Sequence, residues 1–389
     1  MQLAESIYSE GSSAVPPIAR FPEEWTLALA SRGERAFRAQ QIFRWIHRDN
    51  VMDANGMGNL PRPLRAWLAE SGVVPPVSIS QQHKAPDTTH KLALTLADGN
   101  VIETVLIPML PRTGGEPADA DLPDPEDDAD DESDAVPAGR VRVTQCISTQ
   151  VGCAMRCAFC ASGEKGLVRH LGPEEIVAQV LLGRSLLAPE QALTNIVVMG
   201  MGEPLHNYDA TARALRLIAH KDGIGLSKRR ITVSTVGVVS GIQRLGRDFE
   251  GRIGLAVSLH ASDDETRARI VPVAKKYPLR DIITALREYP LPPHRRLTIE
   301  YALIDGVNDR IDHAKRLAEL LAGLRVKVNL IPMNPVANSA LRPPPWDRVL
   351  AFQFVLQQAN CTCLIRRRRG DNINAACGQL AATGKAPRA

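Results

Sequence analysis

Cys153-Ala154-Met155-Arg156-Cys157-Ala158-Phe159-Cys160 places three thiols within one short stretch of the chain. A single tight loop can point all three side chains at one centre. Thiolates are soft ligands that hold zinc or iron–sulfur clusters, and a cluster of four irons normally takes four of them. Three thiolates would leave one iron open to a small chelating ligand. A structural zinc site with a distant fourth ligand, such as His170, is the alternative that this spacing leaves open.

Length and composition indicate a soluble globular protein. The chain has 389 residues, of which 44% are hydrophobic, so it can build one large core and a smaller domain. Its N-terminus lacks the regions of a secretory signal, and no stretch approaches the roughly twenty apolar residues that span a bilayer. Seven cysteines, three of them in one loop, do not resemble an extracellular disulfide framework. We therefore expect a cytoplasmic protein that has no membrane partner.

The net charge of +4 conceals an acidic segment. Residues 113–137 contain eleven Asp and Glu and no Lys or Arg, so the rest of the chain carries +15 once these carboxylates are set aside. The excess favours a polyanionic partner such as RNA. The longer segment 112–139 has no apolar periodicity, and we predict that it is a disordered insertion, to which we assign no function.

Helical periodicity runs from about residue 18 to residue 72. Apolar residues recur on one side of a segment that is rich in Arg and Gln, among them Phe37, Ile42, Trp45 and Ile46. We predict a small helical domain with basic faces. We interpret its aromatic residues as core rather than as platforms for nucleic-acid bases, because large apolar side chains dominate protein cores.

A β-hairpin is predicted over 91–107, where apolar and polar residues alternate around an Asp98-Gly99 turn. In the second strand Glu103 shares a face with apolar residues. A carboxylate in that position lies either at a functional site or at a solvated edge of the sheet. Glu103 is therefore a candidate acid or base on its spacing alone.

From residue 140 onward, short apolar runs alternate with amphipathic helical stretches such as 174–187 and 279–288. This alternation predicts parallel strands joined by crossover helices, hence an α/β sheet or partial barrel. In such folds the active-site residues lie at the carboxyl ends of the strands. The strand candidates are 141–148, 195–199, 231–235, 252–259, 297–303, 326–331 and 363–366.

Polar residues stand where several of these strands end. The segment GMGEP (200–204) follows the second strand; its glycines allow a close backbone approach, and Glu203 can accept a hydrogen bond from an ammonium group. Three further strand ends carry Ser234, Ser258-Leu259-His260 and Asn334. Each alone could be a capping or turn residue, whereas together they could line one pocket.

The C-terminal stretch RRRRGDNINAACGQL (366–380) closely resembles the C-terminal motif of the RlmN/Cfr family, the radical SAM (S-adenosyl-L-methionine) enzymes that methylate adenine in RNA. The cysteine loop, GMGEP, GLSKRR (225–230) and SLH (258–260) stand in the order of that family, and the resemblance runs from roughly residue 33 to 380. It implies class α/β, a radical-SAM partial (β/α)6-type barrel with a small helical N-terminal domain and a hairpin extension.

The resemblance also implies roles for individual residues. One 4Fe–4S cluster with an open iron would be bound by Cys153, Cys157 and Cys160. Cys377 would carry the methyl group as an S-methylcysteine intermediate, Cys146 would resolve the protein–RNA adduct through a transient disulfide with Cys377, and Glu103 would accept a proton. Each turnover would consume two molecules of SAM. The implied SAM-binding residues are Gly202, Glu203, Ser234, Ser258, Leu259, His260 and Asn334.

Of the two branches of this family, RlmN and Cfr, the sequence resembles the RlmN branch more closely. It implies methylation at C2 of an adenine in 23S rRNA, near the peptidyl-transferase centre, and of the adenine 3′ to the anticodon in tRNA. Because C2 of adenine is electron-poor and has no lone pair, it cannot attack the methyl group of SAM directly, and its methylation needs a radical route. We expect a monomer that receives electrons from a flavodoxin-type or other low-potential donor. Two alternatives stay open: the Cfr-like branch, which methylates C8 of adenine in rRNA, and a non-catalytic RNA-binding protein stabilised by a metal.

The predicted organisation has five parts. They are a helical RNA-binding accessory domain at 1–88, the hairpin extension at 89–111, the acidic insertion at 112–139, the radical SAM catalytic domain at 140–382 and a flexible tail at 383–389.

Overall fold

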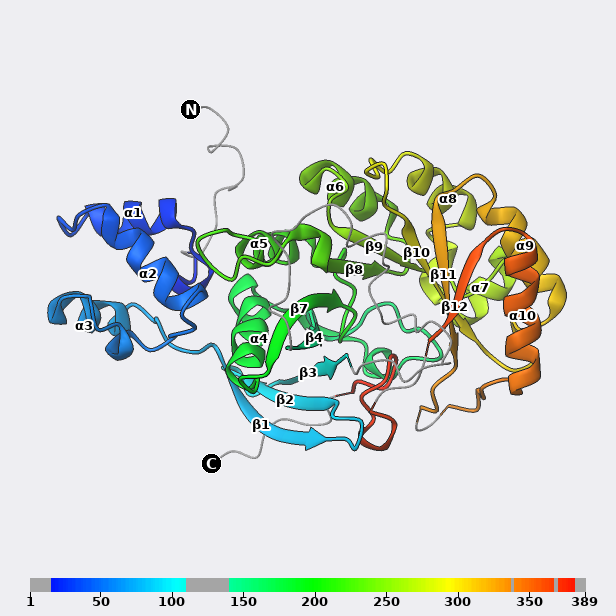
Figure 1. Cartoon of the computed structure of the whole chain (residues 1–389), viewed down its shortest axis with the longest axis horizontal. Coiled ribbons are helices and arrows are strands. Elements are labelled where there is room, and N and C mark those ends of the chain that lie inside the picture. The colour runs from blue at the N-terminus through cyan, green and yellow to red at the C-terminus, as the bar shows by residue number, and fades with distance from the viewer. Residues whose placement is uncertain (1–14, 110–139, 337–338, 367–369, 382–389) are drawn as a thin grey trace.

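The structure, a computed structural model, describes residues 15–109, 140–336, 339–366 and 370–381 (Figure 1). The predicted acidic insertion at 112–139 and the predicted tail at 383–389 lie outside these ranges. No helix within the described ranges is both long enough and apolar enough to cross a membrane.

Three described helices stand apart at the N-terminal end of the molecule (Figure 1): α1 (Pro22–Ala30), α2 (Phe37–His47) and α3 (Arg62–Glu70). Trp25 and Phe43 are fully buried, as expected for core aromatics. Phe43 packs edge-on against His220 of the body, with 4.7 Å between ring centres. Phe37, predicted on the apolar side, is instead 47% exposed, because it is the first residue of α2 and extends beyond the packed face.

Hydrogen bonds attach these helices to the body. Arg184 of α4 (Pro173–Ser185) donates to the carbonyl oxygens of His47 (2.8 Å) and Arg48 (3.0 Å), at the C-terminal end of α2. Carbonyls at a helix C-terminus have no donor inside the helix, so a guanidinium placed there stabilises them. Arg213 of α5 (Tyr208–Ile218) adds an ion pair with the carboxylate of Glu24, in the first turn of α1.

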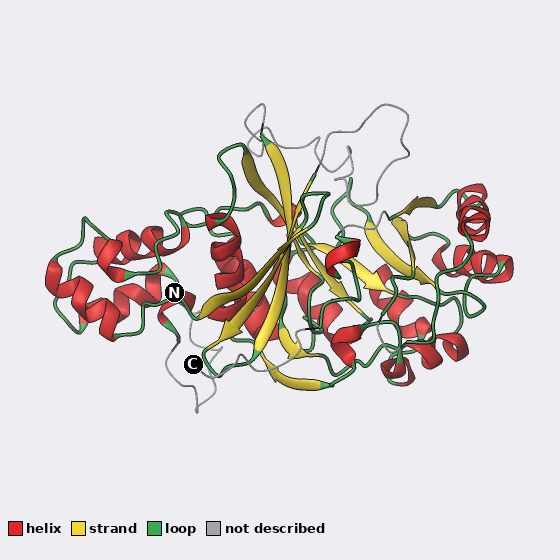
Figure 2. Cartoon of the chain, turned by 90° about the horizontal axis from the view of Figure 1, so that it is seen from below, coloured by secondary structure: helices red, strands yellow, loops and turns green. Residues whose placement is uncertain are grey.

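The described strands form one ten-stranded sheet in the order β1-β2-β3-β4-β7-β8-β9-β10-β11-β12. From β4 to β12 neighbouring strands run parallel, whereas β1 to β4 pair antiparallel. Figure 2 shows the strands crossing the molecule as a twisted sheet with helices outside it. The strands are β1 (Val77–Lys84), β2 (His90–Leu96), β3 (Val101–Pro108), β4 (Val141–Cys146), β7 (Gln191–Val198), β8 (Ile231–Thr235), β9 (Gly254–Ser258), β10 (Leu297–Leu303), β11 (Val326–Pro332) and β12 (Thr362–Ile365).

Crossover helices connect the parallel strands, so the carboxyl ends of all these strands lie at one edge of the sheet. Each helix buries its apolar side against the sheet; α8 buries Leu279, Ile282 and Ile283, for example. Besides α4 and α5, these helices are α6 (Val239–Phe249), α7 (Asp264–Ile270), α8 (Leu279–Arg287), α9 (Ile311–Leu321) and α10 (Trp346–Gln358).

The predicted α/β fold is confirmed, with two differences. The strand candidates coincide with β4 and β7 to β12, so the parallel run contains one strand more than the predicted (β/α)6 barrel. β1 was not predicted, because only Val77 among its residues is buried and the strand shows no apolar alternation. It falls within the predicted domain 1–88, yet it pairs with β2 and extends the hairpin to three strands.

The predicted hairpin forms from β2 and β3. Gly99 adopts a positive φ of 79°, and Asp98 accepts a hydrogen bond from the main-chain N–H of Asn100 (2.9 Å), which closes the turn. β3 lies inside the sheet, and nearly all of it is buried on both faces. Glu103 is 7% exposed, so the solvated-edge alternative for this carboxylate is wrong.

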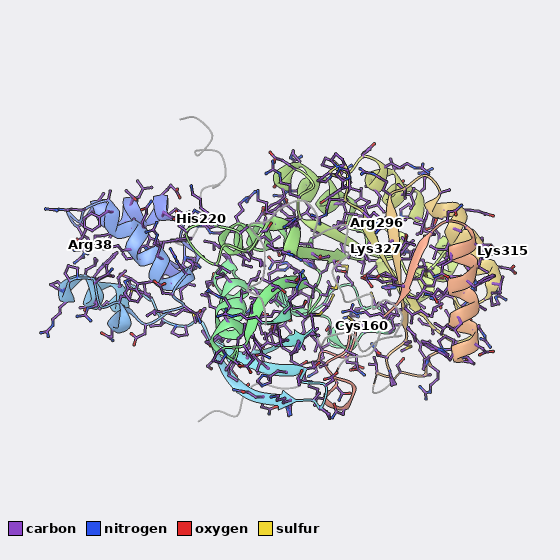
Figure 3. All side chains as sticks on the ribbon, in the orientation of Figure 1. Arg38, Cys160, His220, Arg296, Lys315 and Lys327 are labelled. Carbon is purple, nitrogen blue, oxygen red and sulfur yellow. The ribbon has the colours of Figure 1, made fainter. Side chains whose placement is uncertain are left out.

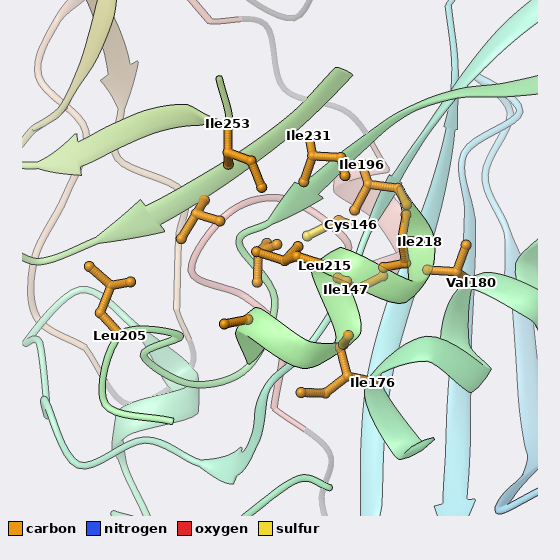
Figure 4. Packing of buried hydrophobic residues seen from close by; sticks show 14 of the residues in the cluster. Cys146, Ile147, Ile176, Val180, Ile196, Leu205, Leu215, Ile218, Ile231 and Ile253 are labelled. Atoms are coloured by element: carbon orange, nitrogen blue, oxygen red, sulfur yellow. The ribbon is translucent and has the colours of Figure 1, made fainter. Parts of the chain in front are cut away.

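A continuous apolar core fills the space between the sheet and the helices α4 and α5. In Figure 4 the side chains of Ile147, Ile196 and Leu215 surround Cys146, at the end of β4. Cys146 is 7% exposed. A thiol in these surroundings is shielded from solvent by aliphatic groups.

A buried arginine joins three loops at the carboxyl edge of the sheet. Arg267 of α7 is fully buried and donates to the main-chain oxygens of Leu259 (3.0 Å), Tyr277 (3.0 Å) and Val236 (2.5 Å). Burial lowers the pKa of this guanidinium to about 10, so it remains charged at neutral pH. One side chain thus fixes the loops that follow β8 and β9.

Arg267→Ala should therefore destabilise the protein strongly. Three buried carbonyls lose their donors, at a cost on the order of 3 kcal/mol, and the melting temperature of the full chain should fall by several degrees. Arg280→Ala is the matched control, since the Arg280 side chain is 87% exposed and pairs only with adjacent Asp281. Equal melting temperatures for the two variants would contradict the structural role of Arg267.

Candidate functional site

The cysteine loop lies between two short antiparallel strands, β5 (Gln150–Gly152) and β6 (Leu167–His170). Cys153 donates its main-chain N–H to Gly166 (3.1 Å), and Cys160 donates to Cys157 (3.1 Å), which curls the loop back on itself. These strands were not predicted, because three or four residues are too few to show a period.

The three thiols resist ionisation in the protein alone. Burial, together with the charges of Cys160 and Glu203, raises the pKa of Cys153 to about 12. Burial and the neighbouring Cys160 and Cys153 thiols likewise raise the pKa of Cys157. Burial also raises the pKa of Cys160. A bound metal would reverse this, because coordination deprotonates a thiol.

A cavity of about 150 Å³, partly open to solvent, lies at the carboxyl ends of the parallel strands. Most of the predicted site residues line this one cavity, although their segments are far apart in the sequence. They are Cys153, Cys157, Cys160, Gly202, Glu203, Ser234, Ser258, His260, Asn334 and Cys377. Leu259 is buried and is not part of the lining; its N–H donates to Glu300 O (3.0 Å), and its carbonyl oxygen accepts from Arg267 Nε (3.0 Å).

Glu203 is the buried carboxylate of the cavity, 2% exposed. Its Oε1 accepts from the N–H of Leu205 (3.0 Å), and its Oε2 accepts from that of Val236 (2.9 Å). Burial raises the pKa of Glu203 to about 7, although these hydrogen bonds oppose the shift. A cationic ligand would favour the ionised form, so this carboxylate is suited to receive an ammonium group.

Gly202 brings the chain close to the ligand space. It has φ of +107°, and a Cβ there would lie 2.6 Å from Cβ of Gln150. Gln150 in turn accepts from Glu203 N–H through Oε1 (2.9 Å). The close approach explains why glycine is needed beside Glu203.

His260 is a neutral donor in the cavity wall. It is 4% exposed, and burial lowers its pKa to about 3. Its Nδ1 accepts from Ala302 N–H (2.9 Å), so in the neutral ring the proton is on Nε2. Phe159 of the cysteine loop packs edge-on against the ring, with 4.6 Å between centres. His260 thus both accepts a backbone hydrogen bond and lines the cavity.

The Cys377 segment is bound to the cavity from two sides. Asn334, after β11, donates through Nδ2 to the carbonyl oxygen of Cys377 (3.0 Å). On the other side, Ala161 N–H in the cysteine loop donates to Gly378 O (2.8 Å), and Ser162 Oγ donates to Leu380 O (2.6 Å). The half-buried Cys377 therefore shares its cavity with the three loop cysteines.

The structure does not bring Cys146 and Glu103 into the lining of this cavity. Both belong to neighbouring strands, since Cys146 pairs with Val105. Glu103 nevertheless reaches the C-terminal segment: its Oε2 accepts from Ala381 N–H (2.9 Å), and its Oε1 pairs with Lys91 Nζ (3.0 Å). The carboxylate thus lies one hydrogen bond from the segment that carries Cys377.

Two supporting residues were missed by sequence reasoning. Gln150 positions Glu203, and Arg267 holds the loops after β8 and β9. Neither belongs to a motif, and a single polar residue in a loop gives no periodic signal. His170, the candidate fourth zinc ligand, is absent from the cavity lining and accepts from Gln150 Nε2 through Nδ1 (2.9 Å).

The donor set fits an iron–sulfur cluster and SAM. The described residues contain no three His, Cys, Asp or Glu side chains already converged on one metal ion, yet three thiols share the cavity wall, and His170, the candidate zinc ligand, does not line it. For SAM, the cavity offers the carboxylate of Glu203. Asn334 Oδ1 is buried and has no hydrogen-bond partner in the described part of the chain.

Comparison with known proteins identifies the family. Residues 147–320 match the radical SAM superfamily, and residues 23–74 match the ribosomal RNA large subunit methyltransferase N-terminal domain. A solved structure of a radical SAM methyltransferase from Sphaerobacter thermophilus superposes with a TM-score of 0.82 at 39% identity, covering 94% of this chain and 99% of that one.

Two sequence relatives extend over almost the same length. The dual-specificity RNA methyltransferase RlmN of Sorangium cellulosum is 56% identical, covering 97% of this chain and 98% of its own. The protein of the same name from Syntrophobacter fumaroxidans is 44% identical, covering 92% and 95%. Relatives this similar match both the helical N-terminal part and the barrel, and the chain therefore belongs to the RlmN family of radical SAM RNA methyltransferases.

Proposed function

We propose that this RNA methyltransferase acts on carbon 2 of specific adenines, in 23S rRNA and in tRNA next to the anticodon, with Cys377 as the methyl carrier. The observation that carries the proposal is the position of Cys377: its segment is hydrogen-bonded to the cysteine loop and to Asn334, in the wall of the cavity that also contains Glu203. The relatives are named dual-specificity RNA methyltransferases, and the matched N-terminal domain is that of a methyltransferase for large-subunit ribosomal RNA. The second RNA class, tRNA, is the one that the family resemblance implies.

Most cavity residues bind the cluster or SAM, whereas Cys377 transfers the methyl group. Cys153, Cys157 and Cys160 hold the cluster, which supplies the electron that cleaves SAM reductively. Glu203 receives the ammonium group of SAM, Asn334 Oδ1 offers a further acceptor, and the Nε2–H of His260 is a donor. Ser234 and Ser258 complete the wall, and Leu259 lies buried behind it.

Cys377 acts as a nucleophile and carrier. Its thiolate would take a methyl group from one SAM, whose thioether product leaves. Reductive cleavage of a second SAM would supply the abstraction of one hydrogen atom from that methyl group, so that the carbon could bond to C2 of adenine. The C2 hydrogen would then leave as a proton, and one electron would pass back to the cluster.

The adduct is resolved when the Cys146 thiolate attacks Sγ of Cys377. The carbon–sulfur bond breaks with its electron pair going to the product carbon, which is then protonated, and a Cys146–Cys377 disulfide remains. A cellular thiol reductant supplies two electrons to reopen it.

Glu103 is the proton acceptor in this scheme. It is buried, it is fixed by Lys91, and it contacts the Cys377 segment through Ala381 N–H. We further propose a monomer that draws electrons from a flavodoxin-type or other low-potential protein.

Nucleoside mass spectrometry of rRNA and tRNA, from cells with and without this protein, tests the position of methylation. Loss of 2-methyladenosine from both pools upon deletion is the expected result. Loss of 8-methyladenosine instead would place the protein in the C8-methylating branch, and no change in either nucleoside would refute the proposal.

Replacement of any one of Cys153, Cys157 or Cys160 by Ala should remove bound iron and abolish reductive cleavage of SAM. The thermal melting of the metal-free chain should stay unchanged. Cys361→Ala is the matched control, because Cys361 is half-buried and outside the cavity. A loop variant that keeps its full iron content would show that the cluster has other ligands.

Cys146→Ala, purified from cells, should carry covalently attached RNA, because the carbon–sulfur bond at Cys377 is no longer resolved. Digestion with nuclease and intact-protein mass spectrometry would measure the residual nucleotide. The Cys146→Ala/Cys377→Ala double variant and Cys361→Ala should both be free of RNA. An RNA-free Cys146→Ala protein would argue against the resolving role.

A further inference from the structure

A second cavity occupies the amino-terminal half of the barrel interior. Every second side chain of a strand points into the barrel, and the position along the strand decides which cavity it lines. On β11, Lys327 and Asn329 line the second cavity, and Ile331, nearer the carboxyl end, lines the first. Met199, Glu300 and Arg366 line both. The second cavity therefore adjoins the cavity that contains Cys377.

This second cavity is strongly basic. Among the described residues that line it, Glu300 is the one carboxylate, against six cationic side chains: Arg229, Arg230, Arg295, Arg296, Lys327 and Arg366. All six are buried or half-buried, and Arg230 is only 9% exposed. A cavity wall that presents this many guanidinium and ammonium groups is suited to a polyanion.

The wall between the two cavities carries a polar pair. Asn329 donates through Nδ2 to Glu300 Oε1 (3.0 Å), and both side chains are buried. This bond orients the amide, and it leaves Asn329 Oδ1 buried without a hydrogen-bond partner in the described part of the chain. An orphaned acceptor in a cavity wall is suited to a ligand N–H donor, such as the amino group of adenine.

We propose that this second cavity is the entry site for the RNA: the cations hold phosphates that flank the target nucleotide, and Asn329 Oδ1 accepts from the adenine amino group as the base enters toward Cys377. The assignment rests on the proposed function. A base inside a folded RNA must be turned out of its stack to reach a barrel interior, and backbone contacts on both sides hold it there.

Salt dependence of RNA binding tests the phosphate contacts. The anaerobic holoenzyme is titrated with a labelled RNA hairpin that contains the target adenosine, at several salt concentrations. Arg296→Ala/Lys327→Ala should bind more weakly, with a slope of log affinity against log salt that is shallower by about 1.4, or about 0.7 for each lost phosphate contact. Arg296→Lys/Lys327→Arg keeps both charges and should restore the slope.

Lys315→Ala is the matched control. Lys315 is an exposed cation on α9 and lies at the outer side of the molecule in Figure 3, whereas Arg296 and Lys327 lie over the barrel centre. A double variant with the slope of Lys315→Ala, in a wild-type enzyme that methylates RNA, would overturn the entry site alone. A wild-type enzyme that methylates no RNA would instead remove the proposed function.

The base contact has its own test. RNA in which the target adenosine is replaced by purine riboside lacks the amino group. The wild-type holoenzyme should bind this RNA at least several-fold more weakly than the adenosine RNA, and Asn329→Ala should bind the two RNAs equally while keeping the wild-type salt slope. Unchanged discrimination in Asn329→Ala would exclude the proposed amino-group contact.

Discussion

The site depends on three thiols that one loop holds at the carboxyl edge of the sheet, where burial raises the pKa of each and Cys160 raises those of Cys153 and Cys157 further. The charge of Arg267 acts in the opposite direction and lowers the pKa of Cys157. The same arginine holds the loops after β8 and β9, so the positive charge and the cavity wall depend on one side chain. The cysteine loop, for its part, anchors the segment of Cys377.

Much of the fold could be predicted from the sequence, since each parallel strand is a short apolar run between amphipathic helices. Strands β8 and β10 have the predicted limits. The strands that were missed lack such a pattern: β1 is mostly exposed, and β5 and β6 are too short. Motif spacing also located the cavity residues. It could not locate Gln150 or Arg267, because their roles arise from contacts with main chain in distant segments.

The two cavities lie one after the other along the strands of the barrel, and each is suited to a different ligand. Alternation in each parallel strand directs every second side chain inward, so neighbouring inward positions on one strand serve different ligands. On β10, Thr298 lines the basic cavity, Ala302 lines the cavity of Cys377, and Glu300 lines both. A substitution at Glu300 is thus expected to disturb both cavities, whereas one at either neighbour affects a single cavity. The Glu300–Asn329 hydrogen bond holds the side chains at the boundary between the two cavities in place.

The barrel should tolerate added sequence in the connection between β3 and β4. Met109 N–H donates to Arg142 O (2.7 Å), and Pro108 pairs with Val143, so the chain leaves and re-enters the sheet at neighbouring points. For a flexible loop, each doubling in length costs only about 0.6 kcal/mol of closure entropy. The barrel can therefore accept connections of very different length here, and a folded passenger such as a fluorescent protein could be spliced between these strands as a reporter without altering the strand register.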